Sequence, residues 1–281
     1  MSIFLRFLTL SFALGFAFAQ DFGVPSSWRK PSTSRSYNER VSIARKAIDA
    51  MVPQMDPSSA QFNGLSLWQS GNVFGSMASF DYITGSHVYK DIVMKGLKTM
   101  HNRFRPDDWE WWATSAFYAY KAYGDSTHLS YAISTWQYVS EYVISPKDAA
   151  SGSHSRKSFS LATTCDGKTM AGGVFWQTLP DSPVVNSITT GEYMTLSALL
   201  AEATGNSTYT KAAILTAQWI ENHNINLENL VLDTIDSYTC TKGQPNNMML
   251  TYNSGKYLEG LSVLTDVTGN NFWRSLYVFQ P

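Results

Sequence analysis

A short pattern of apolar and polar positions recurs along this chain of 281 residues. In each copy an apolar stripe ends at a glycine, a serine, aspartate or asparagine follows, and a new stripe begins shortly afterwards. The copies are DYITGSHVY at 81–89, KAYGDSTHL at 121–129, EATGNSTYT at 202–210 and DVTGNNFWR at 266–274. A glycine just past a helix end can close the last turn in the left-handed conformation, and the polar residue after it can cap the next helix. The pattern therefore predicts four helical hairpins.

The segments between these turns have helical spacing. Residues 129–143 and 209–220 place apolar side chains at i, i+3, i+4 and i+7. Alanine and glycine recur on these faces, which would let neighbouring helices approach closely. Regular structure is expected from about Val41, after a loose leader at 20–40 that is rich in proline, serine and charge. Counting the stripes predicts about nine helices, paired as antiparallel hairpins.

Two long stretches interrupt the helical pattern. Residues 145–185 are rich in Ser, Gly, Thr and Pro and contain GGVFW at 172–176, and residues 224–250 contain the strand-like LVLDTIDSY. Loops of this length inside a compact helical domain usually carry function. The turn glycines are unevenly spaced, which favours a closed toroid of inner and outer helices over an open solenoid of fixed period. The predicted fold is therefore all-α, a toroid of helical hairpins with two long loops.

The first twenty residues are typical of a secretory signal peptide. Arg6 precedes an apolar run of about ten residues that ends in the small-x-small triplet Ala17, Phe18, Ala19. The alternative is a short membrane anchor, but the run is shorter than the roughly 20 residues that a membrane span needs. We therefore predict a cleaved signal at 1–19, a leader at 20–40 and a single domain at 41–281.

Secretion changes the interpretation of the two cysteines. Cys165 and Cys240 each lie in one of the long loops, and in an oxidising compartment a disulfide between them is the simplest assignment. Two free buried thiols are the alternative. Two cysteines without a nearby pair of histidines cannot complete a tetrahedral metal site, so we predict no metal and no cofactor. The sequon that begins at Asn206 is a candidate glycosylation site on an exposed turn.

Composition and motifs exclude several classes of function. Hydrophobic residues make up 44% of the chain, enough for a sizeable core, and the net charge is -1 without a basic run or basic helix face. A nucleic-acid partner is therefore disfavoured. HExxH, G-x-S-x-G and glycine-rich phosphate loops are absent, and the five histidines show no ligand spacing. A mechanism built on carboxylates remains.

The stretch RPDDWEWW at 105–112 offers such carboxylates. One interpretation is a helix start, in which Asp107 and Glu110 form a capping box. That interpretation leaves Asp108 and the tryptophans unexplained. Glycoside hydrolysis with retention needs two carboxyl groups about 5 to 5.5 Å apart, one protonated and one ionised, and aromatic side chains give sugar rings a flat apolar face. At least one of the three tryptophans should pack in the core instead.

DDWEWW has the order Asp-Asp-x-x-Trp-Trp and resembles the catalytic signature of glycoside hydrolase family 76, the endo-α-1,6-mannanases. The resemblance covers roughly residues 40 to 275 and is greatest to secreted fungal members. It continues, in the order the family shows, through GGVFW at 172–176, NSITTG at 186–191, LVLDTIDS at 230–237 and TYNSG at 251–255.

The resemblance implies an (α/α)6 toroid and retaining hydrolysis inside the α-1,6-linked backbone of fungal cell-wall mannan. Carried over by motif position, Asp107 would be the nucleophile and Asp108 the general acid/base. The residues that would contact the sugar are Trp112, Trp176, Asn186, Asp233, Tyr252 and Asn253. An alternative remains for two of them, since Asn186 could cap the following helix and Asn253 could cap a helix that begins near Gly255.

The C-terminal end departs from the family pattern. An (α/α)6 ring needs twelve helices, and about nine are predicted before the chain ends at SLYVFQP. We therefore expect a toroid that is incomplete at the C-terminus. The alternatives to hydrolysis are a mannan transglycosylase and a non-catalytic glycan-binding or wall protein. The predicted partner is α-1,6-mannan, and the chain is expected to be a monomer, extracellular or in the cell wall, without membrane attachment after signal cleavage.

Overall fold

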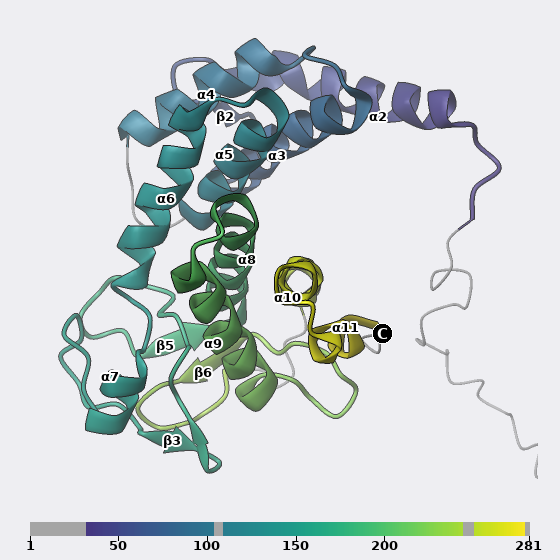
Figure 1. Cartoon of the computed structure of the whole chain (residues 1–281). Coiled ribbons are helices and arrows are strands. Elements are labelled where there is room, and N and C mark those ends of the chain that lie inside the picture. The colour runs from purple at the N-terminus through teal and green to yellow at the C-terminus, as the bar shows by residue number, and fades with distance from the viewer. Residues whose placement is uncertain (1–31, 104–108, 244–249, 279–281) are drawn as a thin grey trace, which may run out of the picture. The chain divides into compact units, whose positions relative to one another are not determined.

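The computed structural model describes residues 32–103, 109–243 and 250–278. Contacts divide the chain into a unit of Met1–Ser34 with Pro281 and a unit of Arg35–Gln280, and the second is described here (Figure 1). Its helices before the first long loop are α2 (Tyr37–Met51), α3 (Leu67–Thr84), α4 (Lys90–Arg103), α5 (Trp109–Tyr123) and α6 (Ser126–Ser140). Those after it are α8 (Ser187–Thr204), α9 (Ser207–His223), α10 (Thr251–Thr268) and α11 (Asn271–Val278). The 3-10 turn η1 (Val52–Gln54) follows α2, and the short helix α7 (Pro146–Ser151) lies in the first long loop.

The helices form an inner row and an outer set. In the inner row α3 packs against α5, α5 against α8, and α8 against α10. The outer helices α6, α9 and α11 pack against the inner helix that precedes each of them in the chain. Helix α8 touches neighbours on several sides, so it is buried on nearly every face from Ser187 to Ala201, including its polar positions. This alternation of inner and outer helices confirms the predicted all-α fold of helical hairpins.

The four predicted turns all have the expected glycine geometry. Gly85, Gly124, Gly205 and Gly269 have φ between 65° and 70° and each follows a helix end. At three turns the next polar side chain caps the following helix by accepting a backbone N–H two residues further on, at 2.8 to 2.9 Å. These caps are Asp125, Asn206 and Asn270. The local signal therefore predicts three turns in full.

The turn after α3 is held differently. Asp81 is 1% exposed inside α3, and its carboxylate accepts the backbone N–H of Val88 at 3.0 Å and that of Tyr89 at 2.9 Å. It also accepts the hydroxyl of Tyr123 at 2.9 Å, across the interface with α5. A buried carboxylate with several donors replaces the small polar cap expected after Gly85.

Helix α2 begins before the expected position. Ser36 and Glu39 form a capping box, with the Ser36 N–H donating to Glu39 Oε2 at 2.8 Å, and the helix starts at Tyr37 rather than near Val41. The start was missed because these two residues stand in a stretch whose proline and serine content suggested a leader. The predicted signal at 1–19 lies outside the described residues.

Small residues let neighbouring helices approach. A Cβ on Gly260 in α10 would lie 2.5 Å from Met194 Cε in α8, and one on Gly96 would lie 2.3 Å from Phe74 Cε1. Both distances are below normal van der Waals contact, so these positions favour glycine. In the described part of the chain, no helix is long and apolar enough to cross a membrane.

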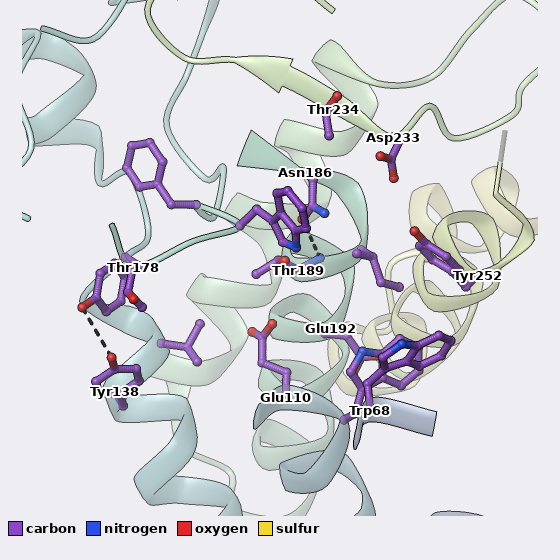
Figure 2. Close-up of a pocket in the computed structure, with 16 residues that line it drawn as sticks. Trp68, Glu110, Tyr138, Thr178, Asn186, Thr189, Glu192, Asp233, Thr234 and Tyr252 are labelled. Carbon is purple, nitrogen blue, oxygen red and sulfur yellow. Dashed lines mark hydrogen bonds between the residues drawn. The ribbon is translucent and has the colours of Figure 1, made fainter. Parts of the chain in front are cut away.

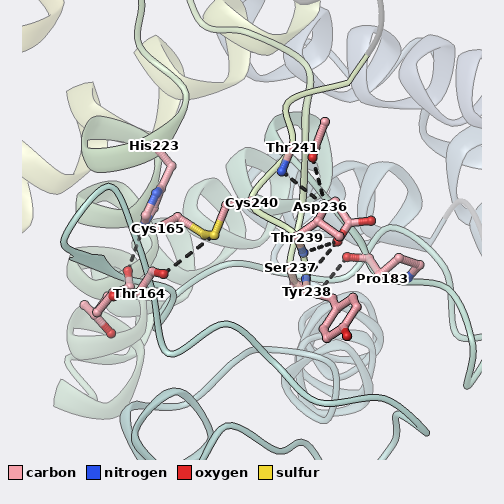
Figure 3. Close-up of a disulfide and its surroundings, with 11 residues drawn as sticks. Thr164, Cys165, Pro183, His223, Asp236, Ser237, Tyr238, Thr239, Cys240 and Thr241 are labelled. Atoms are coloured by element: carbon pink, nitrogen blue, oxygen red, sulfur yellow. Dashed lines mark hydrogen bonds between the residues drawn. A yellow bond between two sulfur atoms is a disulfide. The ribbon is translucent and has the colours of Figure 1, made fainter.

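Short strands and a disulfide join the two long loops. Strand β5 (Val184–Asn186) of the first loop pairs antiparallel with β6 (Thr234–Asp236) of the second, with Val185 opposite Ile235. Cys165 and Cys240 form a disulfide, which confirms the predicted pairing (Figure 3). The other pairs are local: β1 (Met55–Asp56) with β2 (Gln61–Phe62), and β3 (Thr164–Cys165) with β4 (Lys168–Thr169). The two loops therefore form one structural element beside the N-terminal end of α8.

Candidate active site

A cavity of about 300 Å³ is lined by residues of α3, α5, α6, α8 and α10 and of both long loops. Figure 2 shows Trp68 and Tyr252 on one side, Tyr138 and Thr178 on the opposite side, and the carboxyl group of Glu110 between them. Acidic side chains reach it from three elements, namely Glu110 of α5, Glu192 of α8 and Asp233 of the second loop. The cavity therefore combines aromatic walls with carboxyl groups.

The aromatic wall is built from helices far apart in the sequence. The rings of Trp68 in α3 and Trp111 in α5 have centroids 5.1 Å apart, and the ring of Tyr252 in α10 lies 6.2 Å from that of Trp68. Trp176 lines the cavity from the first loop and is 50% exposed. Flat apolar faces of this kind, beside a few polar groups, suit a ligand with apolar ring faces and polar edges.

The GGVFW segment brings Trp176 to the cavity. Gly172 has φ of 102°, and a Cβ there would lie 2.4 Å from the carbonyl oxygen of Leu215 in α9. A Cβ on Gly173 would lie 2.7 Å from Trp219 Nε1. The two glycines allow the loop to pass directly against α9. Beyond them the Trp176 N–H donates to the Val184 carbonyl at 2.9 Å, which fixes the segment beside β5.

Asn186 and Asp233, the two polar residues expected near the sugar from their motifs, both line the cavity. Asn186 is also the N-cap of α8, with Oδ1 accepting the Thr189 N–H at 3.1 Å, so the capping interpretation holds as well. The Asp233 backbone carbonyl accepts the Ser187 N–H at 2.8 Å, and its Oδ1 accepts from Asn253 Nδ2 at 3.0 Å. The Asn186 side chain is thus held by the first turn of α8, and the Asp233 side chain is held by α10.

Asn253 does not line the cavity. It is fully buried in the first turn of α10, which begins at Thr251, so the idea that it caps a helix near Gly255 is wrong. Its side-chain amide instead donates a hydrogen bond to the carboxylate of Asp233, which does line the cavity. Tyr252, one residue earlier, does line the cavity, and burial together with Asp233 raises the pKa of its phenol.

The structure corrects the prediction for Trp112. The residue is 8% exposed, its ring centroid lies 5.5 Å from that of Phe74, and it belongs to the core between α3, α4 and α5. Trp111 lines the cavity in its place. Trp112 is rotated by about 100° from Trp111 around the axis of α5, and in this structure that direction leads to Phe74 in the core.

The predicted catalytic pair, Asp107 and Asp108, lies outside the described residues. The chain continues from them directly into α5, where Glu110 and Trp111 both line the cavity. Asn206, the predicted glycosylation site, is exposed at the turn between α8 and α9.

A buried ionic cluster that the sequence analysis missed lies beneath the cavity. Lys256 Nζ is 3.0 Å from Glu192 Oε1 and 3.0 Å from Glu259 Oε2, and Glu192 Oε2 accepts from Thr114 Oγ1 at 3.2 Å. Glu259 in turn accepts the hydroxyl of Tyr118. The available signal was Glu192 itself, an acid in the otherwise uncharged run that follows NSITTG.

Burial and neighbouring charges together shift the pKa values of this cluster. Burial raises the pKa of Glu192 to about 7, although the Lys256 ammonium opposes the shift. Burial alone would lower the pKa of Lys256, but Glu192 and Glu259 outweigh it and raise that pKa. Burial and the neighbouring Glu192 raise the pKa of Glu110 well above its ordinary range.

Comparison with known proteins identifies the family. The sequence model of glycosyl hydrolase family 76 matches residues 42–277. The chain belongs to this family. The resemblance seen in the sequence motifs is thereby confirmed, and structural neighbours from the family are (α/α)6 toroid enzymes.

A curated relative is the mannan endo-1,6-alpha-mannosidase DCW1 of Candida glabrata, 24% identical over 229 residues. The match covers 73% of this chain and 46% of the relative, so the chain spans about half the length of that protein.

Two solved structures share the fold. An inactive variant of the alpha-1,6-mannanase GH76A of Salegentibacter sp. HEL1_6, in complex with alpha-1,6-mannotriose, has a TM-score of 0.67 at 17% identity and covers 84% of this chain and 68% of its own. Dfg5 from Chaetomium thermophilum in complex with glucosamine has a TM-score of 0.66 at 19% identity, covering 87% of this chain and 63% of its own.

Proposed function

We propose that this protein is a glycoside hydrolase that cleaves α-1,6-mannosidic linkages in mannan by a retaining mechanism. The observation that carries the proposal is the continuity of the family signature with the cavity: DDWEWW runs into α5, where Glu110 and Trp111 line an aromatic-walled cavity. Family membership and the α-1,6-mannan specificity in the names of two relatives support the substrate class.

The mechanism that we propose uses the two adjacent aspartates. Asp107 attacks the anomeric carbon while protonated Asp108 donates its proton to the leaving glycosidic oxygen, giving a covalent mannosyl ester. Ionised Asp108 then takes a proton from water, which attacks the same carbon and releases Asp107. Two close carboxyl groups disfavour double ionisation, so one stays protonated while the other is charged.

The described cavity residues would hold the sugar for this reaction. We assign Trp68, Trp111, Trp176 and Tyr252 to contacts with ring faces, and Asn186 and Asp233 to hydroxyl groups. Asn253 acts through Asp233, because its amide donates to the Asp233 carboxylate and does not line the cavity. Binding in a fixed geometry is itself a large part of catalysis.

We infer that the protein works outside the cell as a secreted monomer, in the medium or the wall. The signal-like sequence at 1–19 motivates this inference. The Cys165–Cys240 disulfide supports it, because such bonds persist in oxidising compartments. The exposed Asn206 in a sequon would then be a glycosylation site.

The test is the release of oligosaccharides from linear α-1,6-mannan. Asp107→Asn and Asp108→Asn should each lower the rate by at least about a hundredfold, since each removes one of the two chemical roles. Asp125→Asn is a matched control, because asparagine also caps helices and Asp125 is not among the cavity residues. Full activity in both Asp107→Asn and Asp108→Asn would refute the assignment.

A second candidate is transglycosylation, in which a sugar hydroxyl replaces water at the covalent intermediate. Half-exposed Trp176 favours it, because the ring offers an acceptor sugar a face on which to stack. Product analysis with an added α-1,6-mannobiose acceptor separates the two reactions. Longer products indicate transfer, and unchanged shortening of the chain indicates hydrolysis. Binding of mannan without any turnover would point to a non-catalytic glycan-binding protein.

A further inference from the structure

Glu110 is a buried acid that lines the cavity and lacks a hydrogen-bond partner among the described residues. Its side chain comes from the first turn of α5, the residue is 7% exposed, and Oε1 is completely buried without a partner. The carboxyl group points between the two walls of the cavity (Figure 2). A buried polar atom without a partner is costly, and such atoms are rare in folded proteins. A ligand in the cavity would supply the missing bond.

The charges around Glu110 favour its neutral form. The titratable groups that face it from neighbouring elements in the described residues are Glu192 and Tyr193 of α8 and Lys256 of α10. Lys256 is already 3.0 Å from the carboxylates of both Glu192 and Glu259. One ammonium therefore serves two anions, and among the described residues Glu110 has no cation of its own. Burial and the charge of Glu192 both favour its protonated state.

A neutral carboxyl group has a distinctive hydrogen-bonding pattern. It presents one O–H donor and one carbonyl acceptor side by side, whereas a carboxylate only accepts. Two neighbouring hydroxyl groups of a sugar ring match this pattern, because one can accept and the other donate. The aromatic side chains around Glu110, including Trp111 on the same helix, provide faces for the apolar side of that ring.

We propose that Glu110 is a sugar-binding residue whose carboxyl group donates one hydrogen bond to, and accepts one from, adjacent hydroxyls of an uncharged hexopyranose ring. This inference rests on the proposed function, since the ring would belong to a mannan chain. It adds a residue that the family signature leaves unspecified, because Glu110 stands at one of the two open positions of Asp-Asp-x-x-Trp-Trp. It also predicts discrimination against anionic sugars, because a further negative charge would lie near the acidic side chains of Glu192 and Asp233.

The experiment measures binding of α-1,6-mannotriose by calorimetry in an Asp107→Asn/Asp108→Asn parent, which prevents turnover. Glu110→Gln keeps a donor and an acceptor in the same place, so its affinity should stay within about threefold of the parent. Glu110→Leu removes both and should weaken binding about tenfold or more, the loss expected for one or two hydrogen bonds. Glu202→Leu is the matched control on an exposed glutamate at the far end of α8, and it should bind like the parent.

Thermal unfolding of each variant separates binding from folding. Leucine replaces an uncompensated buried acid, so Glu110→Leu should keep or raise the melting temperature while losing affinity. Parent-like affinity in Glu110→Leu, or an equal loss in Glu110→Gln, would overturn the role of Glu110 and leave the proposed function intact. Failure of the parent itself to bind mannotriose would instead contradict the mannan substrate.

Discussion

Lys256 and Glu192 form a buried ion pair between α10 and α8, with 3.0 Å between Lys256 Nζ and Glu192 Oε1. The side chains are 11% and 1% exposed. Lys256 Nζ also lies 4.8 Å from the centroid of the Trp111 ring in the cavity wall. The pair therefore connects the packing of two inner helices to the aromatic side of the cavity.

Replacing Lys256 should lower the free energy of unfolding more than replacing Glu192. Lys256→Met leaves the carboxyl group of Glu192 buried without a counter-charge, and we expect a loss of roughly 3 kcal/mol in the free energy of unfolding at pH 7. Proton uptake by Glu192 limits the loss. Glu192→Gln leaves Lys256 with Glu259 and should cost less. Urea denaturation of both variants measures the difference, and a larger loss in Glu192→Gln would contradict this account.

Glu192 should also make stability depend on pH. Burial raises its pKa in the folded protein to about 7, from an ordinary value of 4.5, so between these values the folded state binds more protons than the unfolded chain. Its stabilising effect is thus complete below pH 4.5 and is lost as the pH rises towards 7. The free-energy difference between wild type and Glu192→Gln, measured by denaturation from pH 4.5 to 8, should shift against the wild type as the pH rises. A difference independent of pH would exclude this linkage.

The side chain of Lys157 should hold part of the first long loop in its conformation. Its ammonium donates to the carbonyls of Gln177 and Leu179, each at 2.7 Å, and lies 4.3 Å from the centroid of the Phe175 ring. The contacted residues lie on both sides of Trp176 in the sequence. Lys157→Met should therefore raise KM for mannan about three- to tenfold and leave kcat nearly unchanged, because it loosens a binding loop without touching the aspartates.

Lys211→Met, at an exposed position of α9, is the matched control for that experiment and should leave both constants unchanged. A fall in kcat with constant KM in Lys157→Met would mean that the loop acts on the chemical step instead.

The helical hairpins could be predicted because their signal is local. A turn glycine and the next polar side chain act on the backbone within a few residues, which is why Asp125 and Asn206 cap as expected. The turn after α3 was predicted, but the group that stabilises it was not, because Asp81 lies inside the preceding helix and meets the turn only through folding.

The cavity was predictable in outline and not in detail. The family motifs indicated Trp176, Asn186, Asp233 and Tyr252, all of which line it. Choosing between Trp111 and Trp112 requires the rotation of α5 against its neighbours, which the sequence of α5 alone does not contain. Glu192 and Lys256 were missed for a similar reason, because their meaning comes from facing each other across two helices that are distant in sequence.

Gly172 of GGVFW should tolerate substitution by alanine less well than an ordinary turn glycine does. Gly172→Ala places a methyl group 2.4 Å from the backbone oxygen of Leu215 and forces an alanine to adopt φ of 102°. Backbone cannot move aside cheaply, so we expect a loss of about 3 kcal/mol or more in the free energy of unfolding. Gly167→Ala is the matched control, since that glycine has φ of 73° with nothing within 4 Å of the added methyl group. It should cost only about 1 kcal/mol, the usual penalty for the left-handed region.

The same substitution should also affect ligand binding, because the segment after Gly172 carries Phe175 and Trp176 into the cavity. At a temperature where Gly172→Ala remains folded, its KM for α-1,6-mannan should rise, whereas Gly167→Ala should keep the wild-type value. Chemical denaturation and initial-rate kinetics on the same preparations measure both effects. Equal stability losses in the two variants would mean that the contact with α9 relaxes freely, and an unchanged KM in Gly172→Ala would mean that Trp176 reaches the sugar without support from that contact.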